Sequence, residues 1–217
     1  MSRKWMALVL SVAMVITMVP FGAFAETTTF SDMPGNWSTQ ALQSAVDNGL
    51  LTGYDGKIMP NEKLTRAQMA TIVNRAFGAV NQASLTGFTD VVSTDWFYPE
   101  MAKAVAMGTF QGSGNKLNPN APITREEAFA VVARALNLGA SETVPSGYTD
   151  LGTISDWSKG EVYSLVNNGY IKGSNGMLNA KGHITRAEFA QVMFNVIKDY
   201  VSTAGEHTLT INGNLII

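Results

Sequence analysis

Apolar residues recur along most of the chain at the three- and four-residue spacing of amphipathic helices. One set of apolar stretches ends in a glycine each time, which is typical of a helix C-terminus in the left-handed conformation. A second set begins at a threonine that has Glu or Gln three residues later, the pattern of a capping box. The glycines are Gly49, Gly108 and Gly169, and the threonines are Thr65, Thr124 and Thr185. The pattern predicts helix, glycine-rich loop and helix, three times over.

The three predicted units are copies of one repeat. The capping threonines lie 59 and 61 residues apart, and the other matched positions keep nearly the same period. Each copy opens with an aromatic residue, a hydroxyl residue and an aspartate, and then has a tryptophan and two glycines four residues apart. These are Phe30-Ser31-Asp32, Phe88-Thr89-Asp90 and Tyr148-Thr149-Asp150; Trp37, Trp96 and Trp157; and Gly49/Gly53, Gly108/Gly112 and Gly169/Gly173.

The first 25 residues have the features of a signal peptide. Arg3 and Lys4 precede an apolar run over residues 5–19, and Ala23-Phe24-Ala25 gives a small-x-small cleavage site. The alternative is an uncleaved anchor, but the run is shorter than the roughly 20 residues that span a bilayer. We expect a mature chain of residues 26–217, with 13 basic and 17 acidic residues.

Composition excludes several classes of function. The chain has 217 residues, a net charge of −2, no cysteine, and His183 and His207 as its only histidines. A weakly acidic chain offers no basic field for nucleic acid, and without cysteine it has no disulfide or thiolate metal site. Two histidines support neither a metal centre nor a Ser-His-Asp triad. We therefore expect no catalytic residues, no metal and no cofactor, and no stable membrane insertion after signal cleavage.

An arginine follows the capping threonine in all three copies. A cation at the first helical position meets the positive end of the helix dipole, so a helix former without charge would serve better there. Its repetition suggests that its donors bind an anion, helped by the amide groups of the helix start. The alternative is an internal salt bridge to an aspartate of the Phe/Tyr-x-Asp segment. The arginines are Arg66, Arg125 and Arg186, and the aspartates are Asp32, Asp90 and Asp150.

The tryptophans and the second glycines also allow two interpretations. Each tryptophan opens the first helix of its copy, where it can anchor the core or line a cleft. Partly exposed, it can instead stack on a sugar ring. The second glycine can serve the turn alone, or also let a ligand approach the backbone. The residues concerned are Trp37, Trp96 and Trp157, and Gly53, Gly112 and Gly173.

Taken together, the Phe/Tyr-x-Asp segment, the tryptophan, the Gly-x-x-x-Gly pair and the Ile/Leu-Thr-Arg-x-Glu/Gln motif resemble the S-layer homology (SLH) module. The resemblance covers about residues 30–200. It implies a mainly α-helical fold, with three lobes in pseudo-threefold arrangement around a central helical bundle and a groove between neighbouring lobes. It further implies SLH repeats at residues 26–86, 87–146 and 147–200. It also implies that the protein is secreted and held at the bacterial cell wall, on the cell surface.

The resemblance implies a ligand as well. SLH modules bind a secondary cell-wall polysaccharide or a peptidoglycan-associated glycan, commonly a polysaccharide with a pyruvate ketal whose carboxylate meets the Thr-Arg arginine. By position this role falls to Arg66, Arg125 and Arg186, with the three aspartates, the three tryptophans and Gly53, Gly112 and Gly173 lining the grooves. Other interpretations are an exported glycan-acting enzyme or a protein-binding repeat scaffold, with activity in a C-terminal region beyond the sequence.

The copies depart from the pattern in three places. Gln68 replaces Glu in the first, Ala180 stands where the others have Pro60 and Pro119, and Gly182 and His183 precede the third Ile-Thr-Arg. We expect the groove that uses this loop to be the weakest. After a short linker from residue 201, residues 208–217 read as strand, turn and strand, a short β-like tail that predicts the start of a β-rich segment.

Overall fold

The computed structural model describes residues 29–197, which form a mainly helical protein, as predicted. The signal peptide expected at 1–25 and the β-like pattern at 208–217 lie outside the described residues. Within each repeat a first helix, of 9 residues in the first two repeats and 12 in the third, is followed by a loop and a second helix of 11 residues. The elements are α1 (Thr39–Asp47), α2 (Arg66–Ala76), α3 (Tyr98–Ala106), α4 (Arg125–Ala135), the 3-10 helix η1 (Leu151–Thr153), α5 (Asp156–Asn167) and α6 (Arg186–Val196).

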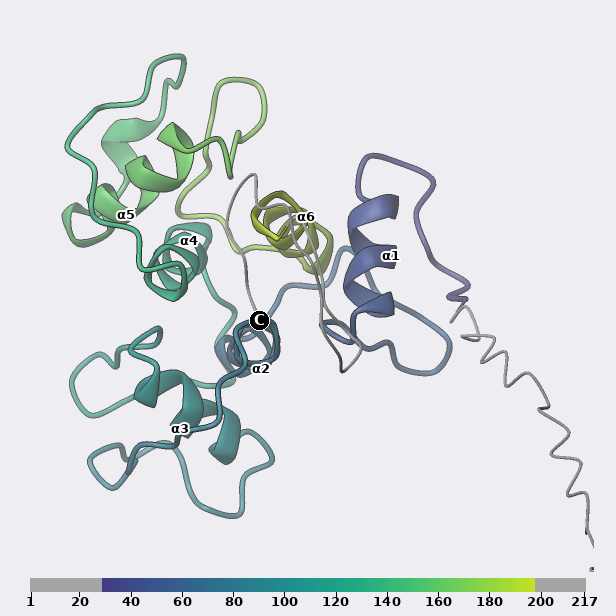
Figure 1. The fold of residues 1–217 in the computed structure, drawn as a ribbon, viewed down its shortest axis with the longest axis vertical. Helices are drawn as coiled ribbons and strands as arrows, with labels where there is room; N and C mark the ends of the chain where they lie inside the picture. Colours follow the sequence, from purple (N-terminus) through teal and green to yellow (C-terminus); the bar gives the residue numbers. More distant parts are fainter. Residues whose placement is uncertain (1–28, 198–217) are drawn as a thin grey trace, which may run out of the picture.

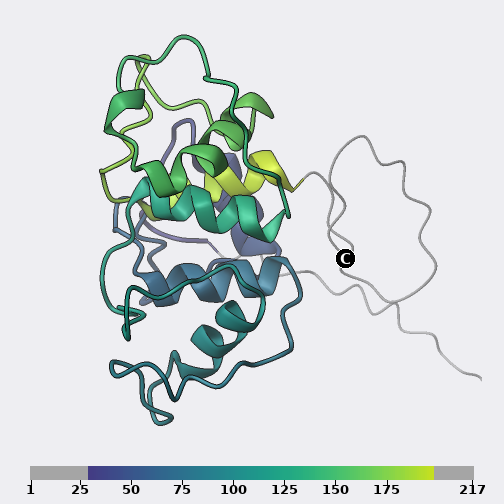
Figure 2. The ribbon, with the colours of Figure 1, turned by 90° about the vertical axis from the view of Figure 1, so that its left-hand side faces the viewer.

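The second helices form the centre and the first helices surround them (Figure 1). In Figure 2, α2 and α4 run side by side across the middle of the molecule. Helix α3 packs on α2, α5 packs on α4, and α1 packs on α6. Each lobe therefore combines the second helix of one repeat with the first helix of the next, and the third lobe joins the two ends of the chain. Among the described residues, none of the helices has the length and hydropathy that crossing a membrane requires.

The predicted capping boxes are confirmed at all three second helices. The hydroxyls of Thr65, Thr124 and Thr185 accept the backbone N–H three residues later. The side chain of Gln68, Glu127 or Glu188 accepts the threonine N–H in return. Each box satisfies two donors that a helix start leaves without an intrahelical partner. Local sequence alone therefore decides where these helices begin.

The residues just before the three capping threonines close a ring of backbone hydrogen bonds. Leu64 N–H donates to the carbonyl of Ile184, Ile184 N–H donates to Ile123, and Ile123 N–H donates to Leu64, at 3.1, 3.1 and 2.9 Å. All three side chains are fully buried. The ring fixes the starts of α2, α4 and α6 relative to one another at one end of the central bundle.

A buried carboxylate ties α4 to the third repeat. Glu126 accepts hydrogen bonds from the backbone and hydroxyl of Ser155 and from the hydroxyl of Ser158, and Lys181 Nζ lies 2.6 Å from its Oε1. Burial raises the pKa of Glu126, but the hydrogen bonds from Lys181 and Ser155 outweigh it, so this pKa lies below its ordinary value. The carboxylate is ionised in the folded protein at neutral pH.

This linkage predicts a pH-dependent contribution to stability. A carboxyl group with a lowered folded-state pKa stabilises the fold above its unfolded pKa, 4.5 for glutamate, and the contribution is lost as the pH falls through the folded pKa. Glu126→Gln should therefore lower the free energy of unfolding at pH 6, and its deficit should shrink steadily below pH 4.5. Urea unfolding at several pH values measures this. The exposed Glu142→Gln is the control, and a deficit that does not change with pH would contradict the assignment.

Candidate functional site

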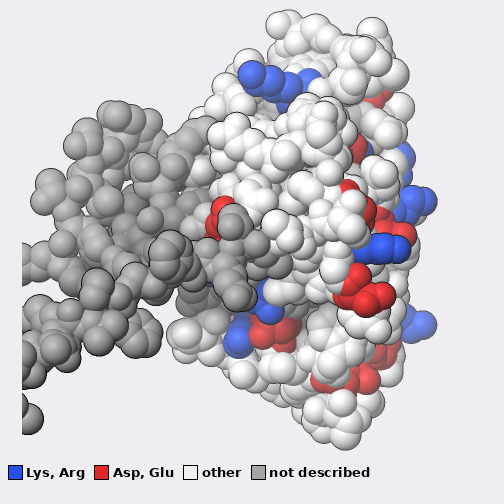
Figure 3. Space-filling view, turned by 90° about the vertical axis from the view of Figure 1, so that its right-hand side faces the viewer, with Lys and Arg blue, Asp and Glu red and all other residues white. Residues whose placement is uncertain are grey.

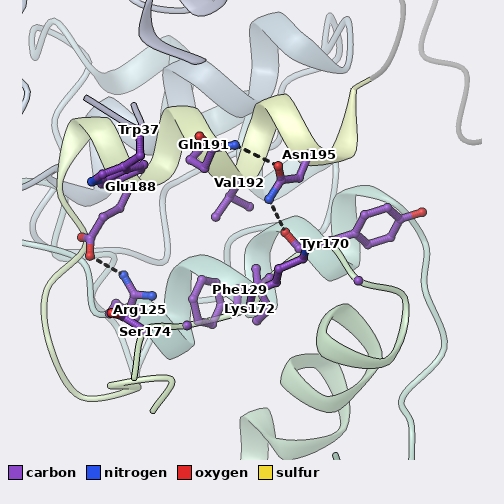
Figure 4. A pocket seen from close by; sticks show the side chains of 13 residues that line it. Trp37, Arg125, Phe129, Tyr170, Lys172, Ser174, Glu188, Gln191, Val192 and Asn195 are labelled. Atoms are coloured by element: carbon purple, nitrogen blue, oxygen red, sulfur yellow. Dashed lines mark hydrogen bonds and ion pairs between the residues drawn. The ribbon is translucent and has the colours of Figure 1, made fainter. Parts of the chain in front are cut away.

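Two cavities lie beside the predicted arginines. The first, about 710 Å³, contains Arg125 and Phe129 of α4, Glu188 and Gln191 of α6, Lys172 of the third loop and Trp37 of the first repeat. Figure 4 shows Trp37 above Glu188, with Arg125 below and Gln191 and Asn195 along α6. Its charged residues are two cations, Arg125 and Lys172, and one anion, Glu188, so an anionic ligand is favoured there.

The second cavity, about 680 Å³, repeats this arrangement one repeat earlier. It contains Arg66 of α2, Phe110 and Gly112 of the second loop, Glu127 and Arg134 of α4, and Trp157 of the third repeat. Here Glu161 also lines the wall, so two cations face two anions. The two cavities share a plan, but the first has the more positive lining.

Each arginine is held by the backbone of the following repeat. The Nε atoms of Arg66, Arg125 and Arg186 donate to the carbonyls of Leu117, Leu178 and Ile58, at 2.7, 2.8 and 2.7 Å. The guanidinium groups of Arg66 and Arg125 also lie over the rings of Phe110 and Phe129, at 5.4 and 5.2 Å. These contacts fix the orientation of the guanidinium groups of Arg66 and Arg125.

Arg66 and Arg125 form the internal ion pairs that the alternative interpretation allowed, but their partners are the capping glutamates and not the aspartates. Arg66 Nη1 lies 2.8 Å from Glu127 Oε1, and Arg125 Nη1 lies 2.8 Å from Glu188 Oε1. Each glutamate thus caps its own helix with one oxygen and pairs with the arginine of the preceding repeat with the other. The sequence held a signal for this, because an acid recurs two positions after the arginine, but its partner lies in a different repeat.

The three aspartates organise the loops. Asp32 accepts the N–H groups of Ile58 and Met59, at 2.7 and 2.9 Å. Asp90 and Asp150 do the same with residues 117–118 and 178–179. Burial raises the pKa of Asp32, but the two amide donors lower it below its ordinary value. These carboxylates set the position of the carbonyls that receive the arginine Nε atoms, and so they act on the arginines through the backbone.

The helix-start amides are not available to a ligand, which corrects a second expectation. In α2 the N–H groups of Arg66 and Ala67 donate to the carbonyls of Ala121 and Pro119, and that of Gln68 donates to Thr65. In α4 the carbonyls of Gly182 and Ala180 receive the equivalent N–H groups. The third loop, despite its lack of proline, makes the same contacts as the others. Any anion bound here is held by side chains.

The tryptophans are surface residues and not core anchors. Trp37, Trp96 and Trp157 are 60%, 62% and 52% exposed, and Trp37 and Trp157 each line one of the cavities. Gly112 and Gly173 also line the cavities, but the fold itself requires them. A Cβ at Gly173, where φ is +64°, would lie 2.1 Å from the Met177 carbonyl, and one at Gly53 equally close to the Phe30 ring. Close packing within the loops therefore requires glycine at these positions whether or not a ligand approaches them.

The third arginine lacks the ion pair of the other two. Arg186 is 8% exposed, and its Nη2 donates to the Thr52 carbonyl at 2.7 Å. The position equivalent to Glu127 and Glu188 is Gln68, so in residues 29–197 no carboxylate oxygen lies within ion-pairing distance of Arg186. Burial lowers the pKa of Arg186, with Asp32 and Glu62 opposing that shift. The side chain stays charged at neutral pH because arginine titrates so high.

Comparison with known proteins assigns the family. The model of the S-layer homology domain matches three segments, at 29–70, 87–129 and 147–190, which are the three repeats. The chain belongs to the S-layer homology domain family. SLH domains are anchoring modules of bacterial surfaces, so the chain is a cell-surface module of the wall-anchoring type. Within residues 29–197 no group of three or more Asp, Glu or His side chains could hold a metal ion.

The relatives are longer proteins. The SLH chain is 33% identical over 208 residues to a surface-layer 125 kDa protein of Lysinibacillus sphaericus, which covers 93% of this chain and 17% of that protein. It is 28% identical over 210 residues to the S-layer protein sap of Bacillus anthracis, covering 94% and 25%. An amylopullulanase of Thermoanaerobacterium thermosulfurigenes is 29% identical over 189 residues, covering 82% and 10%. The chain spans a quarter or less of each.

The missing ion pair of the SLH domain can be restored by one substitution. Gln68→Glu keeps the capping box and should place a carboxylate beside Arg186, raising the free energy of unfolding by up to about 1 kcal/mol. The converse change, Glu188→Gln, also keeps the cap but leaves Arg125 without its counterion, and should lower stability by about 1 kcal/mol or more. Urea unfolding at pH 7 measures both. Equal stability of all three proteins would show that the capping glutamates contribute nothing through the arginines.

Proposed function

We propose that this SLH chain is a non-catalytic anchor that holds an exported protein on the bacterial wall by binding a secondary cell-wall polysaccharide. The observation that carries the proposal is the cavity in which Trp37 stands over Arg125, Lys172 and Glu188. An exposed indole offers an apolar face to a sugar ring, and a guanidinium beside a lysine ammonium offers charge-assisted donors to a carboxylate. An acidic sugar satisfies both.

The ligand we propose is an anionic glycan, such as one with a pyruvate ketal. Its carboxylate would lie at Arg125 and Lys172 and its ring against Trp37. The Gln191 and Asn195 amides would face its hydroxyls, and since Gln191 Nε2 already donates to Asn195 Oδ1 at 2.9 Å, they form one polar strip. The second cavity would bind an equivalent unit through Arg66 and Trp157. Cavities of about 710 and 680 Å³ beside Arg125 and Arg66 support binding at these two sites.

Other functions remain as alternatives for the longer protein. Some relatives carry enzyme names, such as the amylopullulanase, but the matched segment is 10% of that protein. In this chain the recurring carboxylates are engaged with loop amides, helix caps and arginines. Groups with such partners are poorly suited to the acid and base roles of glycoside hydrolysis. A catalytic activity or a protein-binding role would therefore lie in sequence beyond this module.

The first test is co-sedimentation of mature 26–217 with wall sacculi of the bacterium that produces it. We expect binding to native sacculi and none after the secondary polymer is chemically stripped. Binding that survives stripping would point to peptidoglycan as the ligand. No binding to either preparation would contradict the anchoring proposal for this module.

Variants of the exposed tryptophans separate ligand binding from folding better than variants of the arginines, because the arginines also stabilise the fold. Trp37→Ala and Trp157→Ala should each weaken sacculus binding about tenfold, or about 1.4 kcal/mol, and the double variant should bind still more weakly. Since both side chains are more than half exposed, the melting temperatures should stay close to that of the wild type. Val92→Ala, also at an exposed apolar residue, is the matched control. Unchanged binding by the double variant would refute ligand contact at these cavities.

A further inference from the structure

A third cavity lies on the outer face of α1 and has a different character. It has a volume of about 720 Å³, and α1 contributes Gln40, Gln43, Ser44 and Asp47, while Trp37 and Phe194 stand at its edge. Asp47 is the only charged residue in its lining. On the α1 side of the molecule, much of the surface visible in Figure 3 is uncharged, with Lys, Arg, Asp and Glu in separate groups.

The equivalent faces of α3 and α5 are covered by the linker that enters each repeat. Ala83 N–H of the first linker donates to the carbonyl of Ala102 in α3, at 3.0 Å. Ser141 N–H of the second linker donates to the carbonyl of Gly160 in α5, also at 3.0 Å. The second linker approaches so closely that a Cβ on Gly160 would lie 2.6 Å from the Cβ of Ala140.

Residues of α1 can be matched to residues of α3 and α5 by their distance along the sequence from the tryptophan of each repeat. Gln43 corresponds to Ala102, and Gln40 corresponds to Gly160. Asp47 corresponds to Asn167, whose Nδ2 donates to the Ser141 hydroxyl at 3.0 Å and to the Thr143 carbonyl at 2.9 Å. The α1 cavity is therefore the place where a linker lies in the other two lobes.

The order of the helices in the other two lobes indicates which segment of the chain would cover α1. In both covered lobes the linker is the chain that leaves the central helix of that lobe: α2 is followed by the linker over α3, and α4 by the linker over α5. In the third lobe the central helix is α6, which packs on α1. The described chain leaves α6 at Ile197, whose N–H donates to the Met193 carbonyl. Ile197 thus ends the described chain in the lobe of α1 and α6, where no described linker covers the α1 face.

We propose that residues 198–207 dock in the α1 cavity as the third linker. The contacting amides lie six and five residues after the central helix caps, since Ala83 follows Phe77 and Ser141 follows Leu136. The same count from Ile197 reaches Thr203 and Ser202. Residues 202–205 are small or carry hydroxyls, like Gly139, Ala140, Ser141 and Thr143 of the second linker. Asp47, whose Oδ1 accepts from Gln43 Nε2 at 2.7 Å, stands where Asn167 donates two hydrogen bonds. Its further donors would be the hydroxyls or amides of Ser202 and Thr203.

Docking would fix the place at which the chain leaves the SLH domain. The segment after residue 207 would leave the domain at the α1 lobe by a fixed path, and whatever follows it would be held at a set position relative to the wall-binding cavities. This inference does not depend on the nature of the ligand, so it stands or fails separately from the proposed function.

Disulfide trapping tests the proposal in the mature chain, which has no native cysteine. Ala204 lies seven residues after Ile197, as Thr143 lies seven after Leu136, so the test pair is Asp47→Cys with Ala204→Cys. Asn167→Cys with Thr143→Cys is the positive control, because those residues are in contact. Ala106→Cys with Ala204→Cys is the matched negative control, since Ala106 is the α3 residue equivalent to Asp47. A disulfide needs Cα atoms within about 7 Å.

Under mild oxidation we expect the test pair to form the disulfide at a rate within about tenfold of the positive control, and the negative control to form almost none. A test pair no faster than the negative control would overturn the proposal. Hydrogen exchange on the unmodified mature chain gives a second readout, in which the amides of residues 202–204 should be protected as those of Ala83 and Ser141 are. Exchange of these amides at the rate of an unprotected chain would overturn the docking proposal. Protection of the α1 face that appears only when wall polymer is added would also overturn it.

Discussion

Three backbone hydrogen bonds, closed into a ring, set the geometry on which the rest of this SLH domain depends. Leu64, Ile123 and Ile184 each donate to one of the others and accept from the third. A bond of this kind contributes only about 1 kcal/mol, but closure makes each repeat the neighbour of both others. Because every ring residue directly precedes a capping threonine, the ring also places the three second helices. Threefold order at this end of the bundle therefore results from one local motif repeated at a constant period.

The arginine after each capping threonine is stabilised by contacts with another repeat and not by its own helix. At the first position of a helix its charge opposes the helix dipole, and the amides around it are already bonded to carbonyls of the next repeat. What stabilises Arg66 and Arg125 is a carbonyl and a capping glutamate, both supplied by the following repeat. The capping residue has two functions, and Gln68 separates them by keeping the cap without the charge. The three copies are thus equal in fold but unequal in electrostatics.

The difference between interactions within a repeat and interactions between repeats explains what could be predicted from the sequence. Capping boxes, the repeat and the glycine-ended helices depend on residues within a few positions of one another, and the structure confirms them. The glutamate partners of Arg66 and Arg125 were not predicted, and the alternative interpretation named the aspartates instead, because spacing along the sequence cannot choose between acids that meet an arginine only in the fold. Exposure of Trp37 was likewise left open, since it depends on a helix from the opposite end of the chain. Lys172, Gln191 and Asn195 were missed because their positions do not repeat a residue type in the other copies.

Each of the two cavities beside the arginines draws residues from all three repeats. Around Arg125 of the second repeat, Trp37 comes from the first and Glu188 from the third; around Arg66 of the first repeat, Glu127 comes from the second and Trp157 from the third. A single repeat could form its helices and its capping box, but it would carry an arginine without a counterion and a tryptophan facing solvent. Two repeats would still leave one wall of every cavity missing and the ring of hydrogen bonds open. Three copies are therefore the smallest number that completes a cavity, so that any ligand bound there also stabilises the closed arrangement of the whole domain.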